Sequence, residues 1–427
     1  MSIRPAVTGG PRAAVLCAPW VLPGSLRPPG ATDPNPSAGR AIEDGAVALD
    51  DDTVVAVGPR AEVEARYGPG ERIDAILLPA LVNAHLHLEL SHLRGRVEGD
   101  GDGLAGWIGR LLAARTAAPP GEAERAMPAA AEELRRFGVA AVGDVTNTLA
   151  SVPHLSRAGL CGTVFHEVAG FAPERFARIR ESGRAERARL GAVPGITVRE
   201  TPHAVYSIGR KGLDELLRAG PGSIHLAEDP AERLFCREGT GPFRRLLEAM
   251  GSTELDALRV RARSAVAAVA GLLGPGHLAV HCVDLDAEDL ALLAASGATA
   301  VLCPRSNRRI AGARPPLPAL LAARVPLSVG TDSLVSSPSL SPLAELALLR
   351  RDHSEVPAAR LLPLAWNGAA VGAPHIGRLS PGSAPGLLAA PLSGARPVDP
   401  FEFLLGSFAE EERPLTWIRQ NGREAHP

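Results

Sequence analysis

The segment Val82–Leu93 reads VNAHLHLELSHL and places His85 and His87 two residues apart in a run that is otherwise largely apolar. In an extended chain alternate side chains point to the same side, so the two imidazoles share a face about 7 Å apart along the strand. Neutral imidazole is a common ligand of zinc and related divalent cations. A single HxH pair arises by chance in many proteins, so a metal site needs partners elsewhere in the chain.

Polar residues of the same kind follow later apolar segments. They are His203 after ITVRETP, His225 and Glu228 in SIHLAE, His281 in LAVHCV and Asp332 in LSVGTD. In a barrel of parallel strands the carboxyl ends lie at one face, where these side chains would meet the HxH pair. Histidine and carboxylate ligands with one open position activate water. We therefore expect a metal-dependent hydrolase. The alternative is that these are ordinary polar residues at strand ends. In that case Glu228 would lie in the first turn of a helix, and His281 would be a hydrogen-bonded residue of the core.

The elements that must position these residues alternate regularly along the chain. Apolar segments with strand character occur at residues 75–82, 139–145, 162–168, 196–203, 223–228, 277–283, 298–304 and 326–332. Between them lie helical segments, among them 121–137, 173–190, 253–273 and 287–296. Eight β-then-α units predict an α/β fold with a (β/α)8 barrel. A doubly wound sheet is the alternative, because periodicity alone does not close a barrel.

The two ends of the chain have a different pattern. The segment VALDDDTVVAV, residues 47–57, predicts a hairpin from its β-branched residues and central acidic turn. The run Asp50–Asp52 lacks the spaced Asp/Asn–Gly pattern of a calcium loop and is expected to be a solvated turn. A Pro/Gly-rich tail with short apolar runs closes the chain and could pair with the N-terminal strands, which would give a second, discontinuous module.

Composition narrows the classes of function. Acidic and basic residues nearly balance at a formal net charge of -2, which argues against a nucleic-acid partner. The 5 cysteines are scattered without a CxxC pair, so neither a disulfide framework nor a thiolate zinc site is indicated, and a reducing cytoplasm is expected. No apolar run reaches the roughly 20 residues that span a bilayer. We expect a soluble cytoplasmic protein without a membrane partner.

The segments NAHLHLE, SIHLAE, LAVHCV and LSVGTDS, in this order, resemble the amidohydrolase superfamily, specifically its mononuclear branch of purine and pyrimidine deaminases. The resemblance covers essentially the whole chain. It implies a distorted (β/α)8 TIM barrel over residues 79–377, flanked by a small β-sandwich built from residues 1–78 and 378–427.

The resemblance also implies roles, position by position. The metal ligands would be His85, His87, His225 and Asp332. They would hold one divalent cation, Zn²⁺ with Fe²⁺ as the alternative. Three residues would be catalytic: His281 and Asp332 would hold the attacking water, and Glu228, which matches an HxxE motif, would shuttle protons. Binuclear relatives bridge two metals with a carboxylated lysine after the fourth strand, and the single lysine here, Lys211, lies well beyond that point. One metal is therefore preferred over two.

The loops HLHLELSHL, TPHAVYSIG, CPRSNR and GTDSLVSSPSLS resemble those of deaminases acting on 5′-substituted adenosines. Aminodeoxyfutalosine, from menaquinone biosynthesis through futalosine, is the substrate that the resemblance favours. Glu89 and His203 would contact it, and Arg305 or Arg308 would pair with its benzoate carboxylate in bidentate fashion. Deamination of S-adenosylhomocysteine or methylthioadenosine is the first alternative, followed by guanine, triazine amidohydrolase or chlorohydrolase chemistry. A non-catalytic metal-binding barrel is the remaining class, and a homodimer is left open.

Overall fold

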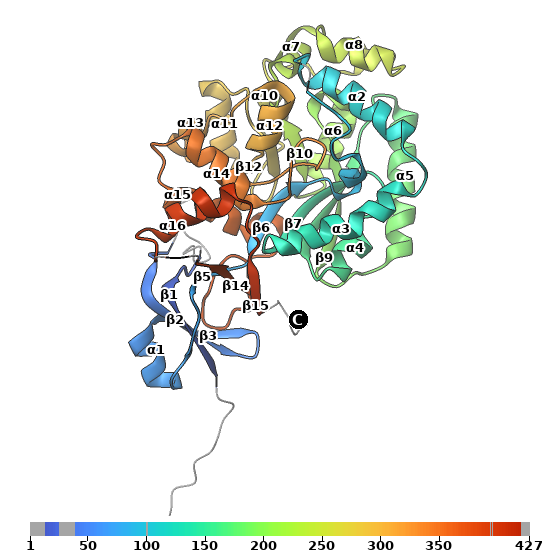
Figure 1. Cartoon of the computed structure of the whole chain (residues 1–427). Helices are drawn as coiled ribbons and strands as arrows, with labels where there is room; N and C mark the ends of the chain where they lie inside the picture. The colour runs from blue at the N-terminus through green and yellow to red at the C-terminus, as the bar shows by residue number, and fades with distance from the viewer. Residues whose placement is uncertain (1–12, 25–38, 100, 393, 395, 420–427) are drawn as a thin grey trace, which may run out of the picture.

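Eight parallel strands form the centre of the protein (Figure 1). The computed structural model describes residues 13–24, 39–99, 101–392, 394 and 396–419. One four-stranded sheet contains β6 (Leu81–Leu86), β7 (Val139–Thr146), β8 (Cys161–Val168) and β9 (Ile196–Pro202). The other four-stranded sheet contains β10 (Ser223–Leu226), β11 (Leu278–His281), β12 (Thr299–Leu302) and β13 (Leu327–Val329). Seven of the eight barrel strands expected from sequence are present as expected, and the first is present in part, as β6.

The two sheets meet at both of their edges. At one seam the Asp332 N–H donates to the His85 carbonyl at 3.1 Å, and at the other the His225 N–H donates to the His203 carbonyl at 2.9 Å. Isolated bridges mark both seams, so the ladder is interrupted there but the strands follow one another around the barrel. The fold is therefore the expected distorted (β/α)8 barrel, and each seam lies beside candidate site residues.

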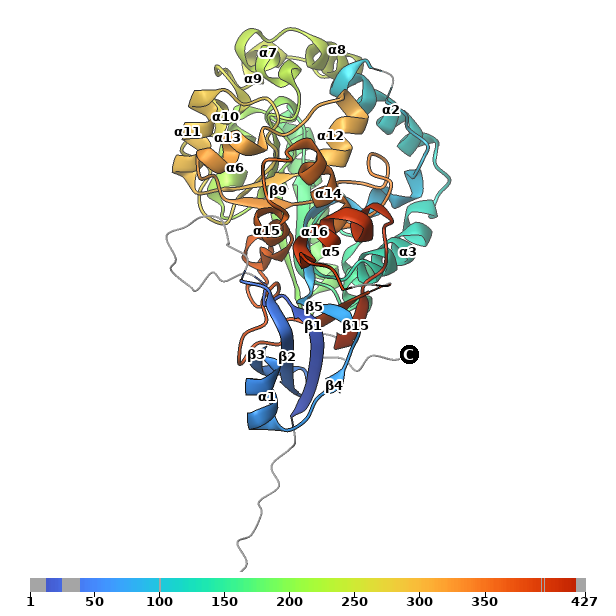
Figure 2. The ribbon, with the colours of Figure 1, turned by 60° about the vertical axis from the view of Figure 1, so that its left-hand side comes forward.

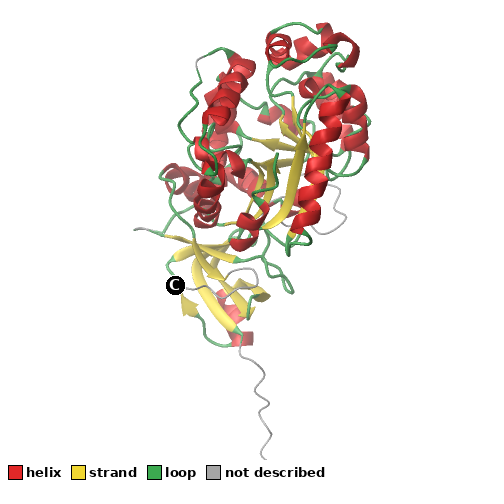
Figure 3. Ribbon diagram, turned by 90° about the vertical axis from the view of Figure 1, so that its right-hand side faces the viewer, coloured by secondary structure: helices red, strands yellow, loops and turns green. Residues whose placement is uncertain are grey.

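Helices surround the strands, as Figure 3 shows. On the outside of the barrel lie α3 (Glu122–Arg136), α4 (Val152–Arg157), α5 (Pro173–Leu190), α6 (Arg210–Arg218), α10 (Ala265–Val269), α11 (Ala287–Ser296), α13 (Leu317–Ala322) and α14 (Pro342–Asp352). Around the strand ends lie η1 (Leu88–Leu93), α2 (Gly103–Ala117), η2 (Val205–Ser207), α7 (Pro230–Glu238), α8 (Pro242–Ala249) and α12 (Pro304–Ala311). None of the helices that the structure describes is long and apolar enough to span a bilayer.

Two expectations about single elements are wrong. The helix expected over 253–273 is broken into α9 (Leu255–Leu258) and α10, because Arg259 leaves the helix with extended backbone and donates to the Cys236 carbonyl at 2.9 Å. The strand expected over 75–82 is two strands, β5 (Ala75–Pro79) and β6, in different sheets. The chain changes its hydrogen-bonding partners between them, which the run of apolar residues does not reveal.

A seven-stranded sheet built from both chain ends lies below the barrel in Figures 1 and 2. Its order is β15 (Thr416–Arg419), β14 (Leu387–Pro391), β5, β1 (Ala14–Val21), β2 (Ile42–Asp50) and β3 (Thr53–Pro59), with β4 (Glu71–Arg72) beside β1. The sheet curls, because Val54 of β3 exchanges backbone hydrogen bonds of 2.8 Å with Ser383 and Gly382, which shortly precede β14. Helix α1 (Arg60–Tyr67) packs on it through Val63. The hairpin expected over residues 47–57 is confirmed as β2 and β3.

Candidate metal centre and active site

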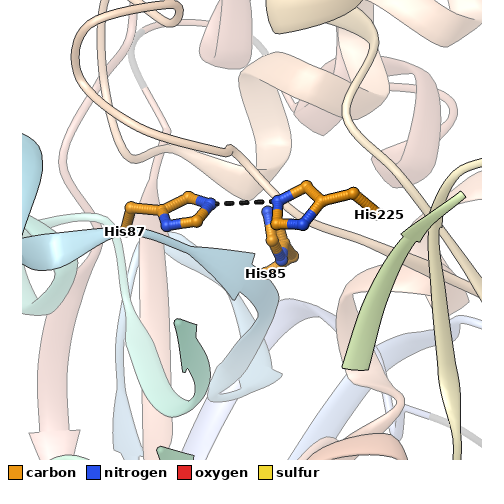
Figure 4. A group of neighbouring side chains, drawn as sticks. All are labelled: His85, His87 and His225. Carbon is orange, nitrogen blue, oxygen red and sulfur yellow. Dashed lines mark hydrogen bonds between the residues drawn. The ribbon is translucent and has the colours of Figure 1, made fainter. Parts of the chain in front are cut away.

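The HxH pair meets two residues from distant strands at one end of the barrel. The Nε2 atoms of His87 and His225 lie 3.2 Å apart. Oδ1 of Asp332 lies 3.8 Å from Nε2 of His85 and 3.6 Å from Nε2 of His87. One ring nitrogen from each of the three histidines lies within 4.8 Å of the other two. In Figure 4 the three imidazoles point toward a common centre.

These four side chains fit a divalent cation. His85 is fully buried, and neither of its ring nitrogens has a hydrogen-bond partner among the described residues. A buried polar nitrogen without a partner is costly, and a bound cation would accept its lone pair. Burial holds the pKa of His85 and of His225 below the usual value, which keeps the imidazoles neutral as metal ligands must be. Three imidazoles and one carboxylate are a common donor set for zinc.

Hydrogen bonds on the outer side of the cluster orient two of these groups. Nδ1 of His225 donates to the His203 carbonyl at 3.0 Å, which directs the Nε2 lone pair toward the cluster. Oδ2 of Asp332 accepts from the Ser306 hydroxyl at 2.6 Å and from the Ser336 hydroxyl at 2.9 Å, which leaves Oδ1 for the imidazoles. Burial opposes the charge on Asp332, but the surrounding histidines outweigh it and hold its pKa well below the usual range.

The backbone at the strand ends is unusual in ways that serve the site. Ala227, His281 and Asp332 have positive φ values of 53°, 76° and 55°. Such conformations cost about 1–3 kcal/mol each in non-glycine residues and are concentrated at functional sites. Gly330 lies so close to β6 that a Cβ there would stand 2.7 Å from the His85 carbonyl oxygen. Glycine at this position therefore allows β13 to bring Asp332 against the HxH strand.

Glu228 and His281 form a second pair beside the cluster. Oε2 of Glu228 lies 3.4 Å from Nε2 of His281, and both side chains are buried. Asn307 Nδ2 donates to His281 Nδ1 at 3.0 Å, so the neutral ring carries its proton on Nε2, facing Glu228. Burial lowers the pKa of His281 to about 3. Burial, then the Asp332 charge, raises the pKa of Glu228 well above its usual value, so this carboxyl can hold a proton near neutral pH.

These groups open into one cavity of about 410 Å³, a size that suits a small organic ligand. Its polar wall includes His87, Asn147, Glu167, His203, His225, Glu228, His281 and Asp332. Its apolar wall includes Leu104, Trp107, Ile108, Leu111, Leu246 and Ile310. A larger cavity of about 1070 Å³ lies between the terminal sheet and the barrel, and none of the expected site residues lines it. The candidate site residues therefore belong to the smaller cavity.

The residues expected to contact substrate differ in their positions. His203 lines the cavity, with Nδ1 held by the Ser207 hydroxyl at 2.8 Å. Glu89 is buried behind the cavity and is not among the residues that line it. Its Oε2 accepts from the Thr146 hydroxyl at 2.7 Å, and its Oε1 accepts from the Asn147 N–H at 2.9 Å. In this structure Glu89 therefore holds the turn after β7.

Arg305 and Arg308 are not brought to the cavity. The Arg305 guanidinium donates to Glu412 at 2.7 Å and to the Ser339 hydroxyl at 3.0 Å. Arg308 forms an ion pair with Asp352. Both arginines lie on α12, whose first turn instead directs Ser306 toward Asp332 and Asn307 toward His281. Two arginines that the sequence did not single out, Arg115 and Arg175, line the cavity.

Sequence reasoning also missed other residues of the site. Glu167 lies one residue before the end of the third barrel strand, so the rule that selected His225 and Asp332 would have found it in GTVFHEV. Ser306 and Asn307 bind Asp332 and His281 from α12, and their only sequence signal is the short motif CPRSNR.

Residues 76–409 match the sequence model of the amidohydrolase family. The chain belongs to this family. It is accordingly a hydrolase of the class that acts on carbon–nitrogen bonds, as its sequence resemblance implied. A short second match, over residues 45–68, is to the imidazolonepropionase-like composite domain of bacteria.

Two curated relatives share 30% identity with this amidohydrolase. One is the 5-methylthioadenosine/S-adenosylhomocysteine deaminase of Nitratidesulfovibrio vulgaris, aligned over 370 residues, 80% of this chain and 78% of the relative. The other is the aminodeoxyfutalosine deaminase of Deinococcus radiodurans, aligned over 341 residues, which are 73% of this chain and 77% of the relative. The solved aminofutalosine deaminase of Helicobacter pylori, in complex with methylthio-coformycin, has the same fold at a TM-score of 0.79, with 21% identity over 96% of this chain and 100% of that chain. A zinc-bound adenosine deaminase from Xanthomonas campestris has a TM-score of 0.70, with 24% identity over 92% of this chain and 88% of that chain.

Proposed function

We propose that this amidohydrolase is a metal-dependent deaminase of a 5′-substituted adenosine-type nucleoside. One divalent cation, zinc or alternatively iron, would be held by His85, His87, His225 and Asp332. The observation that carries the proposal is the convergence of these four side chains with the Glu228–His281 pair at one cavity. The names of the two curated relatives described above support the choice of substrate class.

The chain's own residues supply a route for protons. A bound divalent cation supplies Lewis-acid activation of water, which makes hydroxide available near neutral pH. Glu228 accepts a proton from the attacking water at Oε2 and delivers it to the ring nitrogen beside the amino-bearing carbon. The carboxylate, ionised again, then takes the remaining proton from the hydroxyl that has added to the carbon and passes it to the departing amino group, so that water and the nucleoside give the oxo-nucleoside and ammonia. His281 donates from Nε2 and, with Asp332, orients the water for attack.

Aminodeoxyfutalosine is the substrate that we propose, with methylthioadenosine and S-adenosylhomocysteine as alternatives. The apolar wall around Trp107 and Ile108 suits an uncharged or aromatic 5′ group. Arg175 is exposed, lines the cavity and has no ion pair among the described residues, so it could pair with a carboxylate at the end of that group. Arg175 would take the role expected of Arg305 or Arg308, whose guanidinium groups contact Glu412 and Asp352.

A nucleoside panel tests the proposal. The metal-loaded protein is incubated with adenosine, methylthioadenosine, S-adenosylhomocysteine, aminodeoxyfutalosine, guanine and a triazine. The purine absorbance shift and ammonia release are then followed. We expect the 5′-substituted adenosines to have the highest kcat/KM. Turnover of only guanine or only the triazine would refute the proposed substrate class.

A further inference from the structure

Glu167 lines the cavity and has one carboxylate oxygen without a hydrogen-bond partner among the described residues. It lies near the end of β8, lines the cavity, and is only 8% exposed. Its Oε1 atom is buried and has no hydrogen-bond partner among the described residues. A buried carboxylate oxygen without a donor is costly, and the mechanism derived above does not use this residue. Its position therefore calls for a donor supplied by a ligand.

The carboxylate is held firmly in place. Asn147 Nδ2 donates to Glu167 Oε2 at 2.9 Å, and Arg115 donates to Asn147 Oδ1 at 2.6 Å. The Asn147 N–H in turn donates to Glu89, which is buried two residues after His87. Glu89 therefore supports this wall of the cavity. Because Oε2 is occupied and its donor is fixed, the free Oε1 has a defined position.

A neighbouring histidine does not satisfy this oxygen. Nδ1 of His225 lies 3.6 Å from Glu167 Oε1, and that nitrogen already donates to the His203 carbonyl at 3.0 Å. The other ring nitrogen of His225 faces His87 in the metal cluster. Glu167 therefore lies on the Nδ1 side of the His225 ring, whereas the Nε2 side faces the cluster.

We propose that Glu167 determines specificity by binding the ribose hydroxyls of the nucleoside. An ionised carboxylate only accepts hydrogen bonds, and a hydroxyl is the donor that an adenosine-type substrate carries away from its reacting carbon. The base would reach Glu228 and His281, and the sugar would lie against the wall formed by Glu167 and Asn147. This inference rests on the proposed function, and it assigns to Glu167 the sugar contact that the sequence led us to expect of Glu89.

The test compares each nucleoside that the enzyme deaminates with the 2′-deoxy and 3′-deoxy forms of the same substrate. For the wild-type enzyme we expect at least one deoxy substrate to lose about 10- to 100-fold in kcat/KM, the size of a hydrogen bond to a charged group. In Glu167→Gln the ratio between ribo and deoxy substrates should approach one, because the variant loses activity on the ribonucleoside selectively. Glu181→Gln, an exposed glutamate on α5, should keep the wild-type ratio.

The outcomes separate this inference from the function on which it rests. Equal losses of Glu167→Gln on ribo and deoxy substrates would show a structural role and overturn the inference alone. Glu167→Asp keeps the charge on a shorter side chain, which moves the carboxylate away from the sugar. We therefore expect the ratio of kcat/KM between ribo and deoxy substrates to fall as it does in Glu167→Gln. A wild-type ratio in this variant would contradict the contact. A wild-type protein that deaminates none of the nucleosides would overturn the proposed function and the sugar contact together.

Discussion

Replacing Glu228 with glutamine should remove proton transfer while leaving the site otherwise intact. The side chain is 8% exposed, so bulk water does not readily take its place, and glutamine keeps its size and an oxygen that can accept from His281 Nε2. Positioned acid–base catalysis contributes about 10²–10⁴-fold. At about 1.36 kcal/mol for each factor of ten, the expected loss is about 2.7–5.4 kcal/mol of transition-state stabilisation. We expect it in kcat, with KM changed little.

The assay follows ammonia release and metal content on the same samples. Glu228→Gln should retain the wild-type metal content and lose the pH dependence that proton transfer imposes on kcat. Glu238→Gln, an exposed carboxylate at the end of α7, should behave like wild type. Activity of Glu228→Gln within about threefold of wild type, far short of the loss that general acid–base catalysis requires, would refute the proton-transfer assignment. Loss of metal together with activity would instead make Glu228 a structural part of the metal site.

Further predictions concern the groups that support the site. Ser306→Ala removes the hydroxyl that donates to Asp332 at 2.6 Å, so zinc affinity should fall about 10- to 100-fold in a chelator competition; unchanged affinity would contradict this. Gly330→Ala would place a Cβ 2.7 Å from the His85 carbonyl oxygen and should cost about 1–3 kcal/mol in urea denaturation, whereas Gly274→Ala, in open space, should not. Burial raises the pKa of Glu345 to about 8, above its unfolded value, so its contribution to stability is lost as pH rises. The free energy of unfolding of Glu345→Gln, relative to that of wild type, should therefore rise by about 3 kcal/mol from about pH 5.5 to about pH 8.5, as measured by denaturation at both pH values. A difference that does not change with pH would refute this.

The sequence predicted that the candidate metal ligands are neighbours because each lies at the end of a barrel strand. Parallel strands bring their carboxyl ends to one face, so His85, His225 and Asp332 had to be neighbours once the barrel was inferred. The approach at Gly330 that completes the cluster depends on strand packing, which spacing along the chain does not encode. The same rule applied to β8 would have found Glu167.

Residues on the helices and loops were harder to predict. Arg305 and Arg308 were expected to bind substrate because they follow the seventh strand, but α12 begins at Pro304. Its rotation directs Ser306 and Asn307 into the site and the arginines toward acidic partners. Packing determines which face of a helix is turned toward the site. The motif CPRSNR alone therefore could not show that Ser306 and Asn307 face the site and that the arginines do not. The broken helix over 253–273 has the same kind of cause, because a contact from Arg259 to another element outweighs local helix propensity.

The central claim is that one divalent cation is bound by His85, His87, His225 and Asp332. It is tested most directly by measuring metal per chain with inductively coupled plasma mass spectrometry, in wild type and in His87→Asn and His225→Asn variants whose folding is checked by circular dichroism. We expect one equivalent of zinc or iron in wild type and, in each folded variant, a large loss that parallels the loss of activity. Full metal content in the His225→Asn variant, or full activity of wild type after exhaustive chelation, would contradict the claim.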